Sequence, residues 1–288
     1  MTETFAPPLF GSLDGAFRAL VKAAADSGSH GLAASNASDT WAELTHVSFC
    51  IEDPRRRVIE MPERRVNTAY LATELIWQLA KRSDVEFLAS SAPKIGRFSA
   101  DGTHFTGSAY GEAIFGPQWQ KCRSALDEDA STRRALIVLA DSNEDISKAN
   151  LDVTCTTSLH FMVRDGALDV HASMRSNDIM RGLQGDIFLF TVVQEWMALE
   201  TGLRVGRYFH HANVMQIFMN EKDWSVECSN GTEAQPEPTP PISLPHWSEA
   251  WRSLEGLIES DVEVDRPLHS DDFVEWCWQA ILSRKRRP

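Results

Sequence analysis

The sequence predicts an α+β fold, because patterns typical of strands and patterns typical of helices both occur along the chain. Residues 157–175 predict a β-hairpin, since apolar and polar side chains alternate on both sides of an Asp165-Gly166 turn. Residues 68–81 and 187–200 carry apolar side chains at helical spacing. A hairpin and two helices of this kind indicate a sheet with helices packed against it.

Further elements are predicted from shorter signals. A helix is expected over residues 13–25, and strands are expected over residues 44–51 and 208–219. An apolar run directly after Arg134 predicts a short buried strand. Three segments are predicted to be irregular or peripheral: a polar connection at 89–111, a proline-rich loop or linker at 229–245 and a helical C-terminal segment at 246–288.

Length and composition restrict the class of protein. A chain of 288 residues can bury a large core, and we expect a single domain over residues 1–288. A net charge of −13 argues against a nucleic-acid-binding protein, but a local arginine cluster can still hold a small anionic substrate. No apolar run is long enough to span a membrane and the first residues lack a signal-peptide pattern, so we expect a cytoplasmic protein. Five scattered cysteines without Cys-x-x-Cys pairs favour reduced thiols and no metal site.

Cys155 and Arg175 are the first candidates for chemistry. A cysteine is nucleophilic as its thiolate, which a nearby positive charge stabilises. The predicted hairpin brings Arg175 beside the chain at Cys155, so the guanidinium can supply that charge. Taken alone, Cys155 also fits a buried structural cysteine.

The run from Cys155 to Asp178, with Asp186 eight residues further on, resembles the core of the thymidylate synthase family. The resemblance extends over about residues 43–222. It implies a thymidylate synthase-like α+β fold with a large twisted mixed β-sheet and flanking helices. It also implies that the Cys155 thiolate adds to C6 of a pyrimidine nucleotide.

Two upstream residues extend the resemblance. Glu74 lies in a Glu-Leu-Ile-Trp run similar to the family's Glu-Leu-x-Trp helix, whose glutamate organises water and proton transfer at the base. Tyr110 lies in a Tyr-Gly pair similar to the family's, in which the tyrosine is linked to proton abstraction at C5. Taken alone, Glu74 also fits a solvated helix carboxylate, although an unpaired carboxylate beside an apolar helix face is costly.

The resemblance places four residues at the substrate phosphate: Arg133, Arg134, Arg175 and Ser176. Arg133-Arg134 is similar to a pair that reaches across the family's dimer to the partner's nucleotide, which implies a homodimer with arginines contributed in trans. Forked guanidinium donors suit a phosphate. Without that context, Arg133-Arg134 also fits an exposed basic turn. The family's N-terminal phosphate arginine has no match near Asn36.

Asp186 takes the position that reads the edge of the base, where family members acting on uracil carry asparagine. A carboxylate accepts a hydrogen bond from cytosine N4 and can share a proton with N3. If the base were uracil, an ionised Asp186 would face O4, and both oxygens are hydrogen-bond acceptors. This mismatch costs roughly 1–3 kcal/mol. The resemblance therefore favours cytosine. The alternative is that Asp186 simply caps a helix beginning at Ile187.

Departures from the family pattern concern the cofactor and the sugar. The folate-stacking tryptophans of the family fall on Gly96 and Ser99, whereas Asp178, which matches the acid holding the pterin, is retained. Loss of the indoles is expected to admit water to a methylene intermediate and to give a hydroxymethyl product. The family's sugar-binding His-x-Tyr pair falls on Gln216 and Phe218, which leaves ribose and deoxyribose both open.

The resemblance thus predicts C5 hydroxymethylation of CMP or dCMP with 5,10-methylenetetrahydrofolate, through a covalent adduct of Cys155 at C6. One alternative is a dUMP or UMP C5-methylase of the same fold, in which Asp186 is protonated or only caps a helix. Another is a non-catalytic paralogue that binds nucleotide, for which the changes at Gly96, Gln216 and Phe218 speak.

Overall fold

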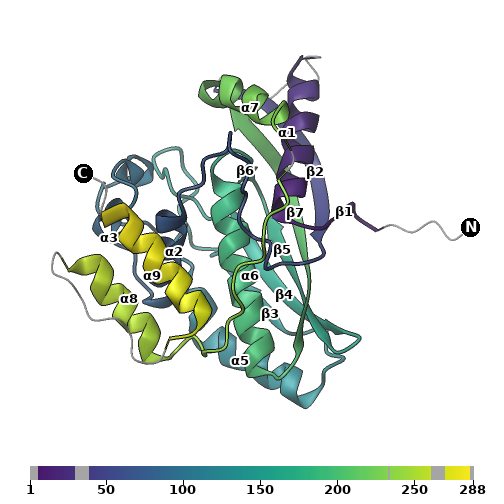
Figure 1. Ribbon diagram of the computed structural model, residues 1–288, viewed down its shortest axis with the longest axis vertical. Helices are drawn as coiled ribbons and strands as arrows, with labels where there is room; N and C mark the ends of the chain where they lie inside the picture. Colours follow the sequence, from purple (N-terminus) through teal and green to yellow (C-terminus); the bar gives the residue numbers. More distant parts are fainter. Residues whose placement is uncertain (1–5, 30–38, 233, 261–269, 286–288) are drawn as a thin grey trace, which may run out of the picture.

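The computed structural model describes residues 6–29, 39–232, 234–260 and 270–285. Its centre is a seven-stranded mixed sheet in the order β1-β2-β7-β5-β4-β3, with β6 added beside β7 (Figure 1). The strands are β1 (Leu9–Phe10), β2 (Thr40–Ile51), β3 (Leu136–Val138), β4 (Thr156–Arg164), β5 (Ala167–Met174), β6 (Asn177–Asp178) and β7 (Arg204–Phe218). The α+β fold with a large mixed sheet, predicted from the resemblance, is confirmed.

The hairpin of β4 and β5 forms where the alternation predicts it. Asp165 and Gly166 both have positive φ angles, 50° and 72°. Positive φ at both central residues defines the type I′ turn, whose twist matches that of the flanking strands. The apolar residues of β5 point into the core, and β5 then pairs in parallel with β7.

The edge strand β3 differs from its prediction. Ile137 is buried, but Leu136 and Val138 are exposed. The physical reason is that successive side chains of a strand point to opposite faces of the sheet, and at β3 only the face that carries Ile137 is covered. The strand after Arg134 exists, but the prediction that it is buried is wrong.

Helix α6 (Gly182–Glu200) is the central helix and lies across one face of the sheet (Figure 1). Most of its side chains are buried on all sides, as expected for a helix covered by other elements on every face. Helix α1 (Leu13–Ser29) packs near β2, and a further layer beyond α6 contains α2 (Thr68–Leu79), α8 (Glu249–Glu259) and α9 (Asp272–Lys285). The shorter helices are α3 (Val85–Ala89), α4 (Gly111–Phe115), α5 (Pro117–Glu128) and α7 (Lys222–Ser229), with 3₁₀ turns at Ile95–Phe98 and Met219–Glu221.

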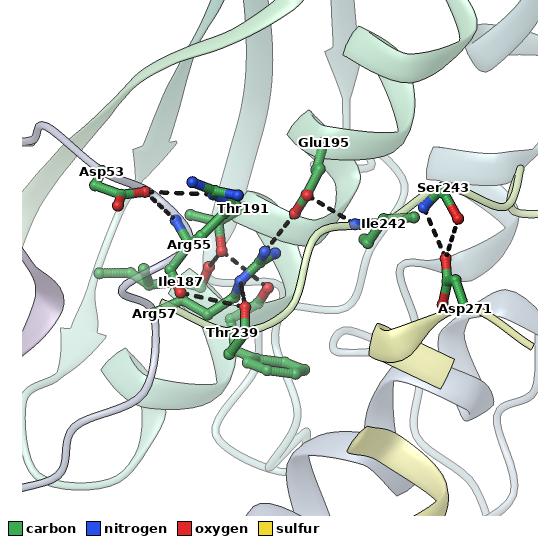
Figure 2. A network of polar contacts seen from close by, with 11 residues as sticks. Asp53, Arg55, Arg57, Ile187, Thr191, Glu195, Thr239, Ile242, Ser243 and Asp271 are labelled. Atoms are coloured by element: carbon green, nitrogen blue, oxygen red, sulfur yellow. Dashed lines mark hydrogen bonds and ion pairs between the residues drawn. The ribbon is translucent and has the colours of Figure 1, made fainter. Parts of the chain in front are cut away.

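The proline-rich segment before α8 is held against α6. Arg57 forms a buried ion pair with Glu195 of α6, and its Nε donates to Thr239 Oγ1 at 2.8 Å (Figure 2). The other oxygen of Glu195 accepts from Ile242 N at 2.9 Å. Asp271 then accepts from the backbone amide of Ser243 at 2.7 Å, which ties the segment to the start of α9. The predicted loop is therefore anchored along much of its length, and the two predicted C-terminal helices are present.

None of the helices in the described parts of the chain is long and apolar enough to cross a membrane.

Candidate active site

Cys155 lies directly before β4, at the end of the sheet where β4 and β5 continue into irregular chain. The amide of Arg175 donates to the Cys155 carbonyl at 2.8 Å, so the ladder between the two strands extends to this pair. Cys155 is partly buried, whereas the other cysteines are fully buried: Cys50, Cys122, Cys228 and Cys277. The structural role considered for Cys155 fits those four thiols better than it fits Cys155.

The electrostatic surroundings of Cys155 contain opposing contributions. Burial raises the pKa of the Cys155 thiol to about 11, and the charge of Arg175 acts in the lowering direction. Asp186, Asp152 and Glu144 act to raise the same pKa. Arg175 is therefore the cation that favours the thiolate, but in the free protein burial outweighs it.

The guanidinium of Arg175 is fixed by backbone carbonyls. Its Nε donates to Thr154 O at 2.8 Å and its Nη2 donates to Val153 O at 2.9 Å. Arg175 is exposed, and its Nη1 makes no hydrogen bond within the described residues, so donors remain for a phosphate. Ser176 follows it, partly buried, between β5 and β6.

Tyr110 is brought to Cys155 by the close approach of α4 to α2. A Cβ atom on Gly111 would lie 2.1 Å from Gln78 O, so only glycine allows this approach. The Tyr110 hydroxyl accepts a hydrogen bond from Thr156 N at 3.4 Å, one residue from the thiol. Burial, then the charges of Asp186 and Cys155, raises the pKa of Tyr110 above its usual value. The predicted Tyr-Gly pair thus lies in the site.

Glu74 faces the same site from α2. Its Oε1 accepts a hydrogen bond from the Tyr70 hydroxyl at 2.8 Å. A Cβ atom on Gly185 of α6 would lie 2.9 Å from the other oxygen, Oε2. Burial raises the pKa of Glu74 to about 7, while the Tyr70 hydrogen bond acts in the lowering direction. Glu74 is therefore no solvated helix carboxylate, and its proton affinity suits a group that exchanges protons near neutral pH.

Asp186 lies inside α6 and does not cap it. The helix begins at Gly182 with Arg181 as its first flanking residue, so the capping alternative for Asp186 is wrong. Burial, then the charges of Glu74 and Asp178, raises the pKa of Asp186 well above its usual value. Its side chain is consequently a carboxyl that holds a proton easily.

Asp178 lies in β6, beside Gln216 of β7. Its Oδ1 accepts from the amides of Met180 and Arg181 at 2.8 and 3.0 Å, whereas its Oδ2 accepts no hydrogen bond within the described residues. Burial, then the charge of Glu221, raises the pKa of Asp178 to about 6. Phe218 lies two residues beyond Gln216, where β7 pairs with the start of β2.

Arg133 and Arg134 are not brought to Cys155 within one chain. Both are exposed at the start of β3, and the Arg133 carbonyl lies 3.1 Å from Nε2 of His160. His160 is five residues from Cys155, which corresponds to roughly 17 Å along β4 at about 3.3 Å per residue. The two arginines therefore do not join Arg175 and Ser176 in the same protomer.

The positions of the missing tryptophans are filled by local structure. Ser99 is buried, and its hydroxyl donates to His104 O at 2.5 Å. A Cβ atom on Gly96 would lie 3.1 Å from Val85 Cγ1, so little room remains for a larger side chain in this conformation. The region around Asn36 lies outside the described residues.

A cavity of about 450 Å³ opens beside Tyr110 and Thr154. Its wall is acidic, with the side chains of Asp101, Asp141, Glu144, Asp145 and Asp152. Carboxylates repel a phosphate, so the phosphate end of a nucleotide is expected on the Arg175 side of the site. Among the described residues, no group of three or more His, Cys, Asp or Glu side chains is arranged to hold a metal ion.

Sequence reasoning missed two tyrosines. Tyr70 bonds Glu74 from one helical turn earlier, a spacing that could have indicated the contact. Tyr208 of β7 is buried, and burial followed by the charge of Asp186 raises its pKa above the usual value. No local signal marks Tyr208, because the packing of α6 on the sheet brings it to Asp186.

The chain is similar to a protein-family model and to several known proteins. A family model described as "Thymidylate synthase" matches residues 45–266. Two similar proteins are named deoxyuridylate hydroxymethyltransferase. The one from Bacillus phage SP01 is 30% identical over 195 residues, which cover 62% of this chain and 51% of the relative. The one from Pseudomonas phage M6 is 30% identical over 198 residues, which cover 64% of this chain and 56% of the relative. A deoxycytidylate 5-hydroxymethyltransferase from Enterobacteria phage T4 is 27% identical over 128 residues, covering 42% and 52%.

The chain spans about half the length of the curated relatives it matches. The family match, by contrast, covers most of the chain, including every candidate site residue from Glu74 to Phe218. The chain belongs to the thymidylate synthase family.

Proposed function

We propose that the protein catalyses folate-dependent C5 hydroxymethylation of a cytidine monophosphate, CMP or dCMP, through a covalent adduct of Cys155 at C6. The observation that carries the cytosine assignment is the placement of Asp186 inside α6, where it faces Glu74 and Asp178 instead of capping the helix.

Asp186 suits cytosine because its carboxyl can both accept and return a proton. Cytosine presents an N4–H donor and an N3 acceptor. A protonated carboxyl donates to N3 and accepts from N4, and it can pass its proton to N3 when thiol addition makes that nitrogen more basic. An asparagine amide has no proton to transfer. The raised pKa of Asp186 supports this role.

Methylenetetrahydrofolate fits the residues on the Asp178 side. The free Oδ2 of Asp178 can accept from the ring N–H donors of a pterin, in a site that already buries the carboxylate. When bound, the folate would supply the one-carbon unit. Gly96 and Ser99 offer no indole to cover it, which favours access of water over the hydride transfer that methylation requires. The three relatives described above are all named hydroxymethyltransferases.

The phosphate is expected at Arg175 and Ser176, whose donors lie beside Cys155. Because Arg133 and Arg134 lie beside the middle of β4, at the level of His160, we assign them to a nucleotide phosphate of another protomer. A homodimer with these arginines contributed in trans explains both their exposure and their distance from Cys155.

We assign the remaining steps to groups around Cys155 and Asp186. Cys155 forms the bond to C6, with Arg175 stabilising its thiolate. Tyr110 lies next to Cys155, and we assign it to the transfer of the C5 proton, the role that the family resemblance implies. Glu74, with a pKa raised to about 7, is suited to take a proton from water. Gln216 beside Asp178, and Phe218 at the end of β7, are expected on the sugar side.

A second candidate is hydroxymethylation of dUMP, because the relatives with the higher identity are named deoxyuridylate hydroxymethyltransferases. Tritium release from C5-labelled CMP, dCMP and dUMP with methylenetetrahydrofolate tests both, with mass spectrometry of the product. We expect release and a hydroxymethyl product with a cytidylate. Release from dUMP alone contradicts the cytosine assignment, a methyl product indicates a methylase, and nucleotide binding without release indicates a non-catalytic paralogue.

A further inference from the structure

We propose that Tyr70 is a positioning residue for the addition of water, because its hydroxyl fixes Glu74 and leaves the second oxygen of that carboxylate facing the base. This inference rests on the proposed hydroxymethylation. It gives Tyr70 a part in the reaction, beside Cys155, Glu74, Tyr110 and Asp186.

The start of α2 holds Tyr70 in place. The side chain of Asn67 accepts from Tyr70 N at 3.1 Å and donates through Nδ2 to Ser91 O at 3.0 Å. The cap therefore satisfies one free amide of the helix and ties its first turn to the segment after α3. Tyr70 and Glu74 lie one turn apart on the same side of α2, where residues spaced by four are neighbours.

The two oxygens of Glu74 have different surroundings. Oε1 accepts the Tyr70 hydroxyl at 2.8 Å. Oε2 faces Gly185 so closely that a Cβ atom there would lie 2.9 Å away. The charge of Glu74 raises the pKa of Asp186, the residue assigned to the base, so the Glu74 carboxylate lies near that residue, and Oε2 is the oxygen that the Tyr70 hydroxyl leaves available. The Tyr70 hydrogen bond fixes the plane of the carboxylate, so one oxygen stays with the hydroxyl and the other stays toward Gly185.

Tyr70 acts as a donor and not as an acid. Burial, then the charge of Glu74, raises the pKa of Tyr70 well above its usual value, so its hydroxyl stays protonated. Two further ionisable groups act on the Tyr70 hydroxyl: Asp186 from α6 and Asp152 from the segment before β4. Asp186 in turn interacts with Asp178 of β6, with Tyr110 at the start of α4 and with Cys155. Both groups that act on Tyr70 are acidic, so the Tyr70 hydroxyl is the donor that favours ionised Glu74.

The step served by this arrangement is the hydration of the exocyclic methylene on the Cys155 adduct. The water oxygen forms a bond to the methylene carbon, and Glu74 takes one proton from that water. The electron pair of the exocyclic C=C bond moves to form C4=C5, the C4=N3 pair moves to N3, and N3 takes the proton of Asp186. Return of the N3 proton to Asp186 restores the C5–C6 double bond, and the sulfur leaves C6 with its bonding pair as thiolate.

The test compares Tyr70→Phe with wild type, using Thr73→Val as the matched control. Thr73 also carries a hydroxyl on α2, but that hydroxyl bonds Ala69 O within the helix at 2.8 Å. For Tyr70→Phe we expect the amount of hydroxymethyl product formed per tritium released to fall roughly tenfold. We also expect the acidic limb of the pH profile of turnover to move up by about one pH unit. Thr73→Val should change neither quantity.

A second measurement does not depend on activity. Titration of Glu74 in the free protein, followed by NMR of carboxyl-labelled glutamate and assigned with Glu74→Gln, should give a higher pKa in Tyr70→Phe than in wild type. An unchanged Glu74 titration, or an unchanged ratio of product to tritium release, overturns the role of Tyr70. Wild type that releases no tritium from any nucleotide overturns the proposed function instead, while the NMR titration still decides whether Tyr70 controls Glu74.

Discussion

Arg175 is bound to the chain around Cys155 through both its backbone and its side chain. Its amide donates to the Cys155 carbonyl at 2.8 Å, and its guanidinium donates to the carbonyls of Thr154 and Val153 at 2.8 and 2.9 Å. The cation is thus held by the two residues before the thiol. This attachment keeps a positive charge at Cys155, directly before the first residue of β4.

Replacement of Arg175 with glutamine is expected to slow alkylation of Cys155 by iodoacetamide about tenfold near pH 8. Without the positive charge the pKa of the thiol should rise by about one unit, and the thiolate fraction falls by the same factor of about ten. The pH dependence of alkylation, with Cys155→Ser as background, measures the effect. Arg204→Gln is the control, since Arg204 also donates to a carbonyl, that of Asp165 at 2.6 Å, at the far end of β5. Equal alkylation rates in Arg175→Gln and wild type would contradict a role for the charge.

The parts of the fold predicted correctly from sequence are those with local causes. The hairpin needs only its alternation and a turn that tolerates positive φ, and both are visible at Asp165-Gly166. The start of α6 has no such signal. Gly182 and Gly185 are poor helix formers, and the sequence therefore predicted a later start. They are helical because neighbours pack closely on them: Asn177 Oδ1 lies 3.2 Å from a Cβ position on Gly182, and Glu74 lies against Gly185.

The candidate site shows the same division. The resemblance indicated Glu74, Tyr110 and Cys155 as members of one site, and the structure brings them together from α2, the start of α4 and the start of β4. The sequence could not show how burial and mutual repulsion raise the pKa values of these groups. Those shifts depend on tertiary packing, which no spacing along the chain encodes.

Asp186→Asn is expected to move base preference from cytidylate toward uridylate by about tenfold to hundredfold in kcat/KM, since the loss of one buried hydrogen-bond match costs roughly 1–3 kcal/mol. Competition between dCMP and dUMP for tritium release measures the ratio. Asp178→Asn is the matched control, because it removes the carboxylate on the folate side and should leave the ratio unchanged. The role assigned to Asp186 is lost if the asparagine variant keeps the wild-type ratio.

Glu74→Gln is expected to stabilise the unliganded protein relative to wild type at pH 8 but not at pH 4. The pKa of Glu74 is raised to about 7 in the folded state, so ionisation destabilises the fold progressively as pH rises from about 4.5 through 7. Allowing for its partial exposure, we expect a gain of about 1–2 kcal/mol in the free energy of unfolding at pH 8.

Urea unfolding of Glu74→Gln and wild type across this pH range measures the gain. The comparison cancels the contribution of buried His210, whose pKa is lowered to about 3 and which therefore adds stability as pH rises. Glu86→Gln, an exposed change on α3, should show no such pH-dependent difference. If the free energies of unfolding of Glu74→Gln and wild type differ by the same amount at every pH, ionisation of the buried carboxylate is not the cause of the difference.

Mixing two inactive variants tests the contribution of arginines in trans. Cys155→Ser keeps Arg134 but lacks the nucleophile, and Arg134→Ala keeps the nucleophile but lacks the phosphate contact. In random mixed dimers one of two sites is intact, so activity should return to about a quarter of wild type after subunit exchange. A mixture no more active than its parents shows that Arg134 acts in its own chain or not at all.

The buried pair of Arg57 and Glu195 predicts how the C-terminal segment is retained. Arg57→Met leaves the Glu195 carboxylate buried and opposite no cation, which is expected to lower the free energy of unfolding by about 3–5 kcal/mol. Arg57 also donates to Thr239 (Figure 2). It lies over the Phe273 ring, 5.3 Å from its centroid, so its loss should loosen both the proline-rich segment and α9.

The double variant Arg57→Met with Glu195→Leu separates charge from packing. Because it removes both charges, it should be more stable than Arg57→Met alone, even though the amide of Ile242 loses its acceptor on Glu195. Urea unfolding gives the two free energies, and limited thermolysin digestion reports cleavage between residues 234 and 248. Faster cleavage in Arg57→Met than in the double variant is the expected order. The reverse order would show that the ion pair does not retain the segment and that apolar contacts of Ile242 and Phe273 do.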